Sequence, residues 1–437
     1  MEWWLMLLLL LGGLVVLMAS GLPVAFCFML LNMIGVYFFF GGEKGLIQLI
    51  HSLDDAVTNF TLVPLPLFVL MGEVMFLSGV APNMIDALDK WLGRLPGRLC
   101  LLAVGGGTLF GAVSGASMAS VAMLGSTLLP EMRKRGYEKR MSLGSILGSG
   151  GLDLMIPPSG LAVLLGAVAE VSIGKLLIAI TVPGLLMAGL YAAYIIGRCW
   201  LQPSIAPAYT VTLPPLSQKL VATVKYVLPL GFIIFLVIGI IFLGVATPSE
   251  AAATGALGSL LLAAAYKQLS WKVVKESLGA VTETTIMMFI IISGAVAFGQ
   301  ILAYSGASKG LSEFTIGLPV TPILIIIAMQ VVGLFLGMFM SPVAIMMITL
   351  PMFMPVVMAL GFNDLWFAAI FLLNMGVGQI SPPFGINLFV MKSVAPPDTT
   401  MEDVFRAALP YCYLDVIVMG LMIAFPSIAL WLPGLMR

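Results

Sequence analysis

Apolar runs long enough to cross a lipid bilayer recur along the whole of this chain. A spanning helix needs about 20 mostly apolar residues. Such runs occupy residues 3–40, 61–79, 97–130, 141–168, 175–200, 226–245, 248–266, 279–304, 321–358, 364–394 and 407–434. Because 61% of the residues are hydrophobic and only 9% are charged, a soluble fold is excluded. We therefore predict an all-α polytopic membrane protein.

Charge, cysteines and short motifs exclude several classes of function. The formal net charge is zero and the basic residues are scattered, so a nucleic-acid site is not expected. The four cysteines stand in apolar runs without C-x-x-C spacing, which excludes a zinc site and a disulfide framework. There is no phosphate-binding G-x-x-x-x-G-K-[ST] motif and no H-E-x-x-H motif. We predict neither an enzyme nor a resident cofactor.

An internal repeat relates the two halves of the chain at a constant offset of 225 residues. Pro130 recurs as Pro355, and Gly151 recurs as Gly376. The pair Pro157-Pro158 likewise recurs without any gap, as Pro382-Pro383. We predict that residues 1–202 and 226–437 are duplicated halves, joined by a polar cytoplasmic linker at 203–225.

Charge indicates that the second half is inverted in the membrane. Arg133, Lys134, Arg135, Lys139 and Arg140 follow the first Gly-rich apolar stretch, whereas the equivalent part of the second half has no basic cluster. Because basic loops stay in the cytoplasm, the two equivalent loops are expected on opposite faces. Each half is predicted to hold about five transmembrane helices and one re-entrant hairpin, near 97–130 and near 321–358. This architecture is typical of secondary transporters.

The candidate site lies where these helices have to break. Small residues turn the first hairpin, and a serine and a proline stand at the same place in the second. Opposite them, each half contains a span interrupted by a double proline, which frees carbonyl oxygens for a cation. Helix N-termini at these breaks can face an anion. The predicted ion and substrate residues are Ser114, Gly115, Ser117, Pro157, Pro158, Ser159, Ser341, Pro342, Ser381, Pro382 and Pro383.

The oxygen atoms at these breaks suit a hard cation such as sodium, and the hydroxyl groups of Ser114, Ser117, Ser341 and Ser381 are its candidate ligands. The acid Asp153 stands four residues before the first double proline. A buried ionised group is costly in a membrane, so Asp153 either faces the ion pathway or is a neutral structural residue. The breaks themselves have a plainer interpretation, as helix kinks. Their pairing across the repeat favours a site.

Several motifs resemble those of the large membrane subunit of TRAP (tripartite ATP-independent periplasmic) transporters. They are Gly111-x-x-Ser114-Gly115-Ala116-Ser117, Ile156-Pro157-Pro158-Ser159, Ser172-Ile173-Gly174, Thr247-Pro248-Ser249-Glu250-Ala251 and Ser381-Pro382-Pro383-x-Gly385. The resemblance implies sodium-driven import of a small organic acid, a carboxylate or a sulfonate, across the bacterial inner membrane by an elevator-like movement. It also implies two partners, a small four-helix membrane subunit and a periplasmic substrate-binding protein.

Two other functions stay open on the sequence alone. A stand-alone ion-coupled anion transporter of the wider ion-transporter superfamily would share the repeat. An intramembrane enzyme would need a nucleophile or a pair of acids within the spans, and we find neither pattern. The chain also departs from the usual family pattern at Ala116, Ser341, Ser381 and Asp153, which bears on the ion ligands and on the substrate.

Overall fold

The described part of the chain consists of helices joined by turns, which confirms the predicted all-helical class. The structure is a computed structural model, which describes residues 2–93, 95–114, 117–207 and 214–436, and only the backbone of residues 81, 82 and 112–114. Within these ranges there is no strand. The helices of the first half are α1 (Trp3–Ala19), α2 (Val24–Phe39), α3 (Glu43–Thr58), α4 (Pro64–Leu77), α5 (Val80–Leu92), α6 (Arg98–Ser114), α7 (Ser117–Lys134), α8 (Lys139–Leu152), α9 (Gly160–Val168), α10 (Ile173–Ala179) and α11 (Thr181–Leu201).

The second half begins with a short helix and contains the longest one. Its helices are α12 (Leu216–Ala222), α13 (Leu228–Phe242), α14 (Pro248–Ala265), α15 (Trp271–Tyr304), α16 (Ala307–Ile316), α17 (Pro322–Gly337), α18 (Pro342–Ala359), α19 (Asp364–Ile380), α20 (Ile386–Val394), α21 (Met401–Ala424) and α22 (Ser427–Leu430). The starts of α7 and α18, and those of α8 and α19, stand 225 residues apart, which is the offset of the sequence repeat.

Helix ends follow local sequence signals. Gly21 has a positive φ of 86° at the reversal between α1 and α2, a conformation that suits glycine. At the start of α14, Thr247 and Glu250 form a reciprocal capping box around Pro248. The Glu250 carboxylate accepts a hydrogen bond of 2.8 Å from the Thr247 backbone N–H. The motif Thr247-Pro248-Ser249-Glu250 is therefore explained as a helix start.

Six helical stretches of the described chain are long and apolar enough to cross a membrane. They are residues 60–77, 173–201, 216–242, 271–304, 342–359 and 401–424. Five shorter apolar helices accompany them, among them α1, α2 and α17. The half-helices α9 and α20, of nine residues each, are too short to span a bilayer alone.

The structure differs from the sequence prediction in three amphipathic segments. In residues 270–278 and 399–409, apolar residues recur at helical spacing with charged residues on the opposite face, which predicts separate surface helices. Instead, these residues lead into α15 and α21 and form their first turns. The helix α3, over Glu43–Thr58, was not expected at all. In the predicted linker 203–225, residues from Leu216 onward are helical and continue into α13.

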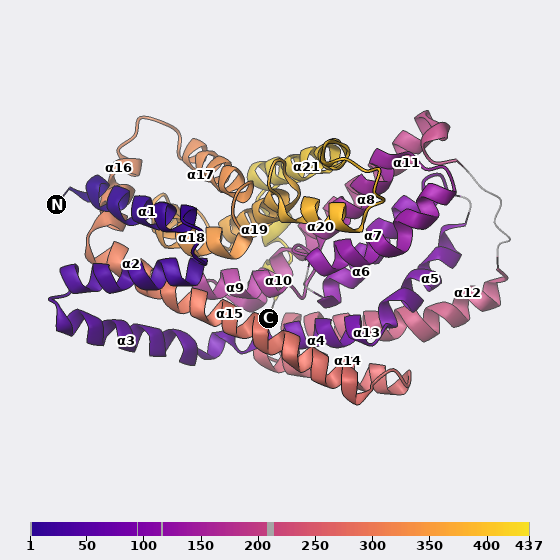
Figure 1. The fold of residues 1–437 in the computed structure, drawn as a ribbon, viewed down its shortest axis with the longest axis horizontal. Helices are drawn as coiled ribbons and strands as arrows, with labels where there is room; N and C mark the ends of the chain where they lie inside the picture. Colours follow the sequence, from indigo (N-terminus) through magenta and orange to yellow (C-terminus); the bar gives the residue numbers. More distant parts are fainter. Residues whose placement is uncertain (1, 94, 115–116, 208–213, 437) are drawn as a thin grey trace.

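Helices from the two halves pack against each other in an exchanged arrangement. The helix α4 packs on α14, and their counterparts α15 and α2 also pack together. In Figure 1, α1–α3 and α16–α18 lie towards the end of the molecule that carries the N-terminus. Helices α5–α8, α11 and α12 lie towards the other end, and α9, α10 and α19 lie between the two groups.

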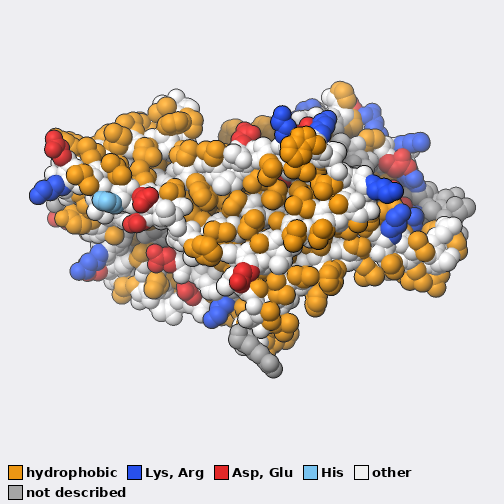
Figure 2. Space-filling view, turned by 90° about the horizontal axis from the view of Figure 1, so that it is seen from below, with side chains coloured by type: hydrophobic (Ala, Val, Ile, Leu, Met, Phe, Trp, Pro, Cys, Tyr) orange, Lys and Arg blue, Asp and Glu red, His pale blue; other side chains and the backbone are white. Residues whose placement is uncertain are grey.

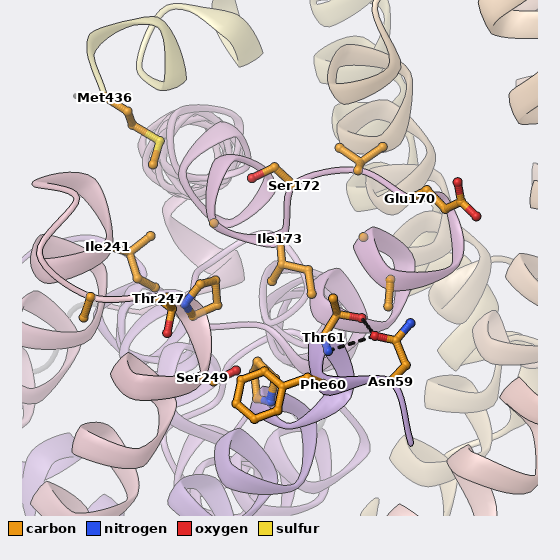
Figure 3. Close-up of a pocket in the computed structure, with 17 residues that line it drawn as sticks. Asn59, Phe60, Thr61, Glu170, Ser172, Ile173, Ile241, Thr247, Ser249 and Met436 are labelled. Carbon is orange, nitrogen blue, oxygen red and sulfur yellow. Dashed lines mark hydrogen bonds between the residues drawn. The ribbon is translucent and has the colours of Figure 1, made fainter. Parts of the chain in front are cut away.

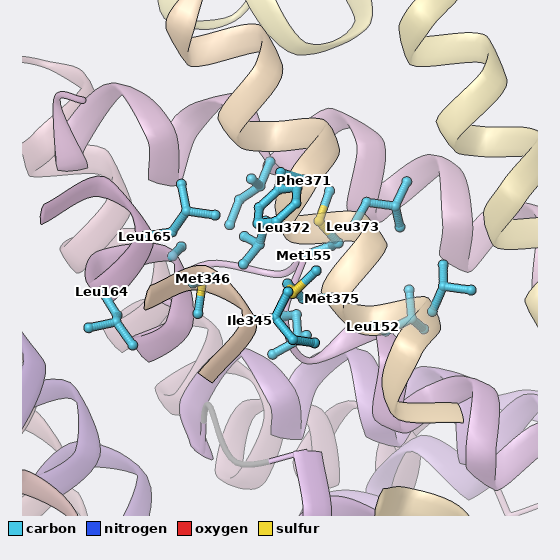
Figure 4. Close-up of a cluster of buried hydrophobic side chains, with 14 of the residues drawn as sticks. Leu152, Met155, Leu164, Leu165, Ile345, Met346, Phe371, Leu372, Leu373 and Met375 are labelled. Carbon is cyan, nitrogen blue, oxygen red and sulfur yellow. The ribbon is translucent and has the colours of Figure 1, made fainter. Parts of the chain in front are cut away.

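A dense apolar core surrounds the two helix breaks. Every residue of α19 from Leu365 to Ile380 is buried. Figure 4 shows Leu152 at the end of α8 and Met155 of the first break in one cluster of buried side chains with Met346 of α18 and Met375 of α19. The face of the molecule in Figure 2 is also largely apolar, with most of its Lys and Arg side chains towards one end. An apolar core inside an apolar surface is the pattern of a multi-pass membrane protein.

Candidate functional site

The first break lies between α8 and α9, where Ile156 and Pro157 line an apolar pocket of about 460 Å³. Residues 151–160 are all buried, and the Pro157–Pro158 peptide bond is cis. Ser159 is the N-cap of α9, where its hydroxyl accepts a hydrogen bond of 3.3 Å from the Ala162 backbone N–H. The predicted residues Pro157, Pro158 and Ser159 therefore do form a helix interruption. The Ser159 hydroxyl is already used to cap the helix that follows.

The second break, between α19 and α20, is open on one side. Its Pro382–Pro383 bond is also cis, and Pro383 is exposed while Ser381 is buried. The Ser381 hydroxyl donates to the sulfur atom of Cys412 in α21, at 3.8 Å. The ring of Phe384 lies 5.7 Å from that of Phe339, in the turn between α17 and α18. The second hairpin therefore touches the break of its own half.

Ser117, at the start of α7, joins the first hairpin to both breaks. Its hydroxyl donates to the Gly150 carbonyl of α8 at 2.6 Å. The same oxygen accepts a hydrogen bond of 2.6 Å from the side-chain amide of Asn387 in α20. That amide also donates to the Gln379 side-chain oxygen in α19 at 3.3 Å, and the Oδ1 atom of Asn387 has no partner among the described residues. The four residues form a buried polar cluster that we call the Ser117 cluster.

The tip of the second hairpin is placed differently. Ser341 is exposed and is the N-cap of α18, accepting a hydrogen bond of 3.3 Å from the Ala344 backbone N–H. Pro342 is the first residue of that helix. Among the described residues, no hydrogen bond joins Ser341, Ser381 and Ser117 to one another. The Ser114 side chain and Gly115 lie outside the described residues.

Asp153 stands at a close crossing of α6 and α8. An ideal Cβ on Gly111 would come within 2.8 Å of the Asp153 Cα, so only glycine fits there. Asp153 is fully buried. Neither of its carboxyl oxygens has a hydrogen-bond partner among the described residues, although the Ser120 hydroxyl lies near the carboxyl group. In the second half, Gly378 takes the equivalent place and packs on Gly337 of α17, where an ideal Cβ would lie 2.8 Å from the facing Cα. Asp153 therefore stands at a position of the repeat that is a glycine, Gly378, in the second half.

Sequence reasoning missed several buried polar residues near the breaks. Asn374 of α19 donates to both the backbone and the side-chain oxygen of Gln330 in α17, at 2.6 and 2.8 Å. Asp415 of α21 is fully buried and accepts a hydrogen bond from the Tyr191 hydroxyl of α11. Asp415 and Asn374 do stand inside apolar runs, so they were visible as polar residues within spans. Only the fold shows which partners they have.

An ion-pair cluster lies at the loops next to α7, α8 and α21. Arg133 and Lys139 pair with Asp398 at 2.8 and 3.5 Å, and Lys139 also reaches Asp403 at 3.3 Å. The Asp403 carboxylate also accepts a hydrogen bond of 3.0 Å from the Thr400 backbone N–H. These side chains are largely exposed and screened by water, so the pairs contribute little to stability.

A cavity of about 680 Å³ lies apart from the breaks. As Figure 3 shows, Phe60 and Thr61 line it together with Thr247 and Ser249 at the start of α14 and Glu170 in the turn after α9. None of the predicted site residues lines it, nor does any described Lys or Arg. An organic anion would meet the Glu170 carboxylate there without a compensating positive charge.

A family model covers nearly the whole chain. The model described as "Tripartite ATP-independent periplasmic transporter, DctM component" matches residues 11–428. The C4-dicarboxylate TRAP transporter large permease protein DctM of Pseudomonas aeruginosa is 32% identical, over 88% of each chain. The ectoine TRAP transporter large permease protein TeaC of Halomonas elongata is 28% identical, over 96% of this chain and 97% of its own.

A solved structure shares the fold. The YdaH transporter of Alcanivorax borkumensis superposes with a TM-score of 0.65 at 16% identity, over 91% of both chains. At that identity the similarity concerns the fold alone. The permeases related in sequence are named as transporters and not as enzymes.

Proposed function

This chain belongs to the DctM component family of tripartite ATP-independent periplasmic transporters, and we propose that it is the sodium-driven permease of such a system. Its substrate is a small organic acid, a carboxylate or a sulfonate, and its location is the bacterial inner membrane. The observation that carries the proposal is the meeting of a hairpin and two broken helices in one buried polar cluster, inside a multi-pass membrane fold. Irregular backbone survives at such depth only where it is enclosed or lines a pathway.

The proposed architecture has two inverted halves that work as an elevator. The common offset of the helix starts and the exchanged packing of α4 on α14 and of α2 on α15 support this arrangement. In an elevator, the hairpins and breaks would move together past α4, α14, α2 and α15. Inversion requires that 133–140 and 361–364 lie on opposite faces of the membrane.

Labelling of single cysteines tests the inversion. One cysteine would be placed at Arg135 and another at Gly361 in a cysteine-less background, and each would be treated with an impermeant maleimide from either side. We expect labelling of the first from the cytoplasm and of the second from the periplasm. Labelling of both positions from the same side would refute the inverted halves.

The proposed ion and substrate sites are the hairpin tips and breaks. Carbonyl oxygens freed by the double prolines, with hydroxyls such as Ser114, Ser117, Ser341 and Ser381, would hold sodium. The N-termini of α9 and α20 begin at the breaks and would face the acid group of the substrate. Because three of these hydroxyls now cap helices or bond within the protein, binding would involve their rearrangement.

Family membership supports two partners, a small membrane subunit and a periplasmic substrate-binding protein. The test is uptake of radiolabelled organic acids into liposomes that contain the lone chain or the complete set of three proteins, under an inward sodium gradient. We expect uptake by the complete set only. Equal uptake by the lone chain would favour the stand-alone transporter instead.

A further inference from the structure

The second buried acid of the membrane region, Asp415, has no role in the site described above. It is fully buried in α21. Its Oδ1 atom accepts a hydrogen bond from the Tyr191 hydroxyl, and its Oδ2 atom has no partner in the described part of the chain. An ionised carboxylate accepts several hydrogen bonds when it is satisfied. A single hydrogen bond from a phenolic hydroxyl therefore does not offset the cost of burying the charged form of this carboxyl group.

The surroundings of Asp415 offer no positive charge. The titratable groups that face it are Tyr191 from α11 and Cys412 from its own helix. Tyr411 packs behind Tyr191, with ring centroids 5.0 Å apart. Across the described residues of α8, α11, α19, α20 and α22, which pack on α21, no Lys, Arg or His and no second carboxyl group faces Asp415. A buried charge without a partner costs several kcal/mol, so the group has to bind a cation or a proton.

A proton fits these surroundings better than a metal ion does. Hard cations such as Ca²⁺ and Mg²⁺ are held by about six oxygen ligands, whereas the Tyr191 hydroxyl is the one described group that bonds to this carboxyl group. An ideal Cβ on Gly151 would meet Asp415 Oδ2 at 3.8 Å, and the Ile380 Cδ1 and Tyr191 hydroxyl atoms at 3.9 Å each. A proton on Oδ2 makes the group neutral and needs no cage of ligands.

The position of Asp415 places that proton between the two breaks. Gly151 stands two residues before Asp153 at the end of α8, and Ile380 directly precedes Ser381. Gly151 also touches its repeat counterpart Gly376, whose ideal Cβ would lie 3.4 Å from the Gly151 carbonyl oxygen. A change of charge on Asp415 therefore alters the electrostatic environment where α8 and α19 cross, beside both breaks.

We propose that Asp415 is a proton-binding site of the transport cycle. Its carboxylate takes a proton from water onto Oδ2 to reach the packed state described here, and it returns that proton to water in a conformation that hydrates it. A ligand that prefers one conformation shifts the balance between the two. The proton thus acts beside the proposed sodium ion, and this role rests on the proposed transport function.

The direct test is infrared difference spectroscopy on the full chain in lipid nanodiscs, titrated from acid to alkaline pH. The wild type should show the carbonyl stretching band of a buried protonated carboxyl group, with a ratio of the two forms that changes about tenfold per pH unit. The component of that band that belongs to Asp415 should vanish in Asp415→Asn and move in Tyr191→Phe, which removes the phenolic donor but keeps the ring, while the component of the other buried carboxyl group, Asp153, persists in both variants. The exposed control Asp398→Asn should keep both components. If Asp415→Asn does not fold, Tyr191→Phe decides alone, and an unmoved band overturns the proposal.

Transport provides the second readout. In the complete three-protein system, the pH dependence of uptake at saturating sodium should be flattened in Asp415→Asn and preserved in Asp398→Asn. Unchanged pH dependence in Asp415→Asn means that the acid is structural, and it overturns the proposal. Wild-type uptake that does not depend on sodium at any pH would instead contradict the proposed function. The infrared result on Asp415 does not depend on that outcome.

Discussion

Replacing Ser117 by alanine tests whether the Ser117 cluster holds the first hairpin in its working position. The substitution removes a donor to the Gly150 carbonyl and an acceptor for the Asn387 amide, each at 2.6 Å. The Asn387 amide keeps its hydrogen bond to Gln379 and loses one of its two acceptors. The main loss is therefore the side-chain donor to the buried Gly150 carbonyl. A buried group that loses its partner costs about 1–3 kcal/mol. If sodium binds when the hairpin is closed, the sodium concentration for half-maximal uptake should rise about 5–150-fold.

The matched control for this experiment lies on the same helix. Ser126 is exposed, and its hydroxyl bonds only to the Met123 carbonyl of its own helix, at 3.0 Å. Ser126→Ala should therefore leave the sodium dependence unchanged. Sodium-dependent uptake of radiolabelled acid by the reconstituted three-protein system is the assay. If Ser117→Ala has the same sodium dependence as Ser126→Ala, the cluster does not support the ion site.

Three further substitutions test the helix contacts, each by the thermal stability of the purified protein. Gly378→Ala should lower the melting temperature, because the new Cβ would meet the Gly337 backbone at 2.8 Å and overpacking costs about 1–3 kcal/mol. The control Gly420→Ala should leave the melting temperature unchanged, since an ideal Cβ at Gly420 has nothing within 4 Å. Gly111→Ala should be destabilising through Asp153, and adding Asp153→Gly should recover part of the loss; no recovery would refute the contact. Thr400→Ala removes the N-cap of α21 and should cost about 0.5–2 kcal/mol, and an unchanged melting temperature would contradict that role.

Much of the fold could be predicted because the membrane reduces the choices. Apolar runs predict helices, and prolines and glycines predict their ends, so the breaks at both double prolines are found where expected. The 34-residue helix α15 was not predicted. A polar, amphipathic start suggests a separate surface helix, and periodicity does not show that the backbone continues unbroken into the apolar part.

The site was predictable only to the level of the segments. The serines were read as free ligands, but Ser159 and Ser341 cap helices and Ser117 bonds to two other segments. The two caps are local, with partners three residues away, but the bond between Ser117 and Asn387 joins residues 270 positions apart, and a sequence pattern holds no record of such a contact. Asp415 was overlooked for the same reason, since its only described donor, Tyr191, is 224 residues away.

The most direct test of the account is the ion that drives accumulation. The three proteins would be reconstituted in liposomes, and uptake of the acid that the binding protein retains would be followed under an inward sodium gradient or an equal potassium gradient. We predict accumulation above the outside concentration with sodium only, and its collapse when a sodium ionophore is added. Equal accumulation under the potassium gradient, or accumulation that survives the ionophore, would contradict sodium-driven transport by this chain.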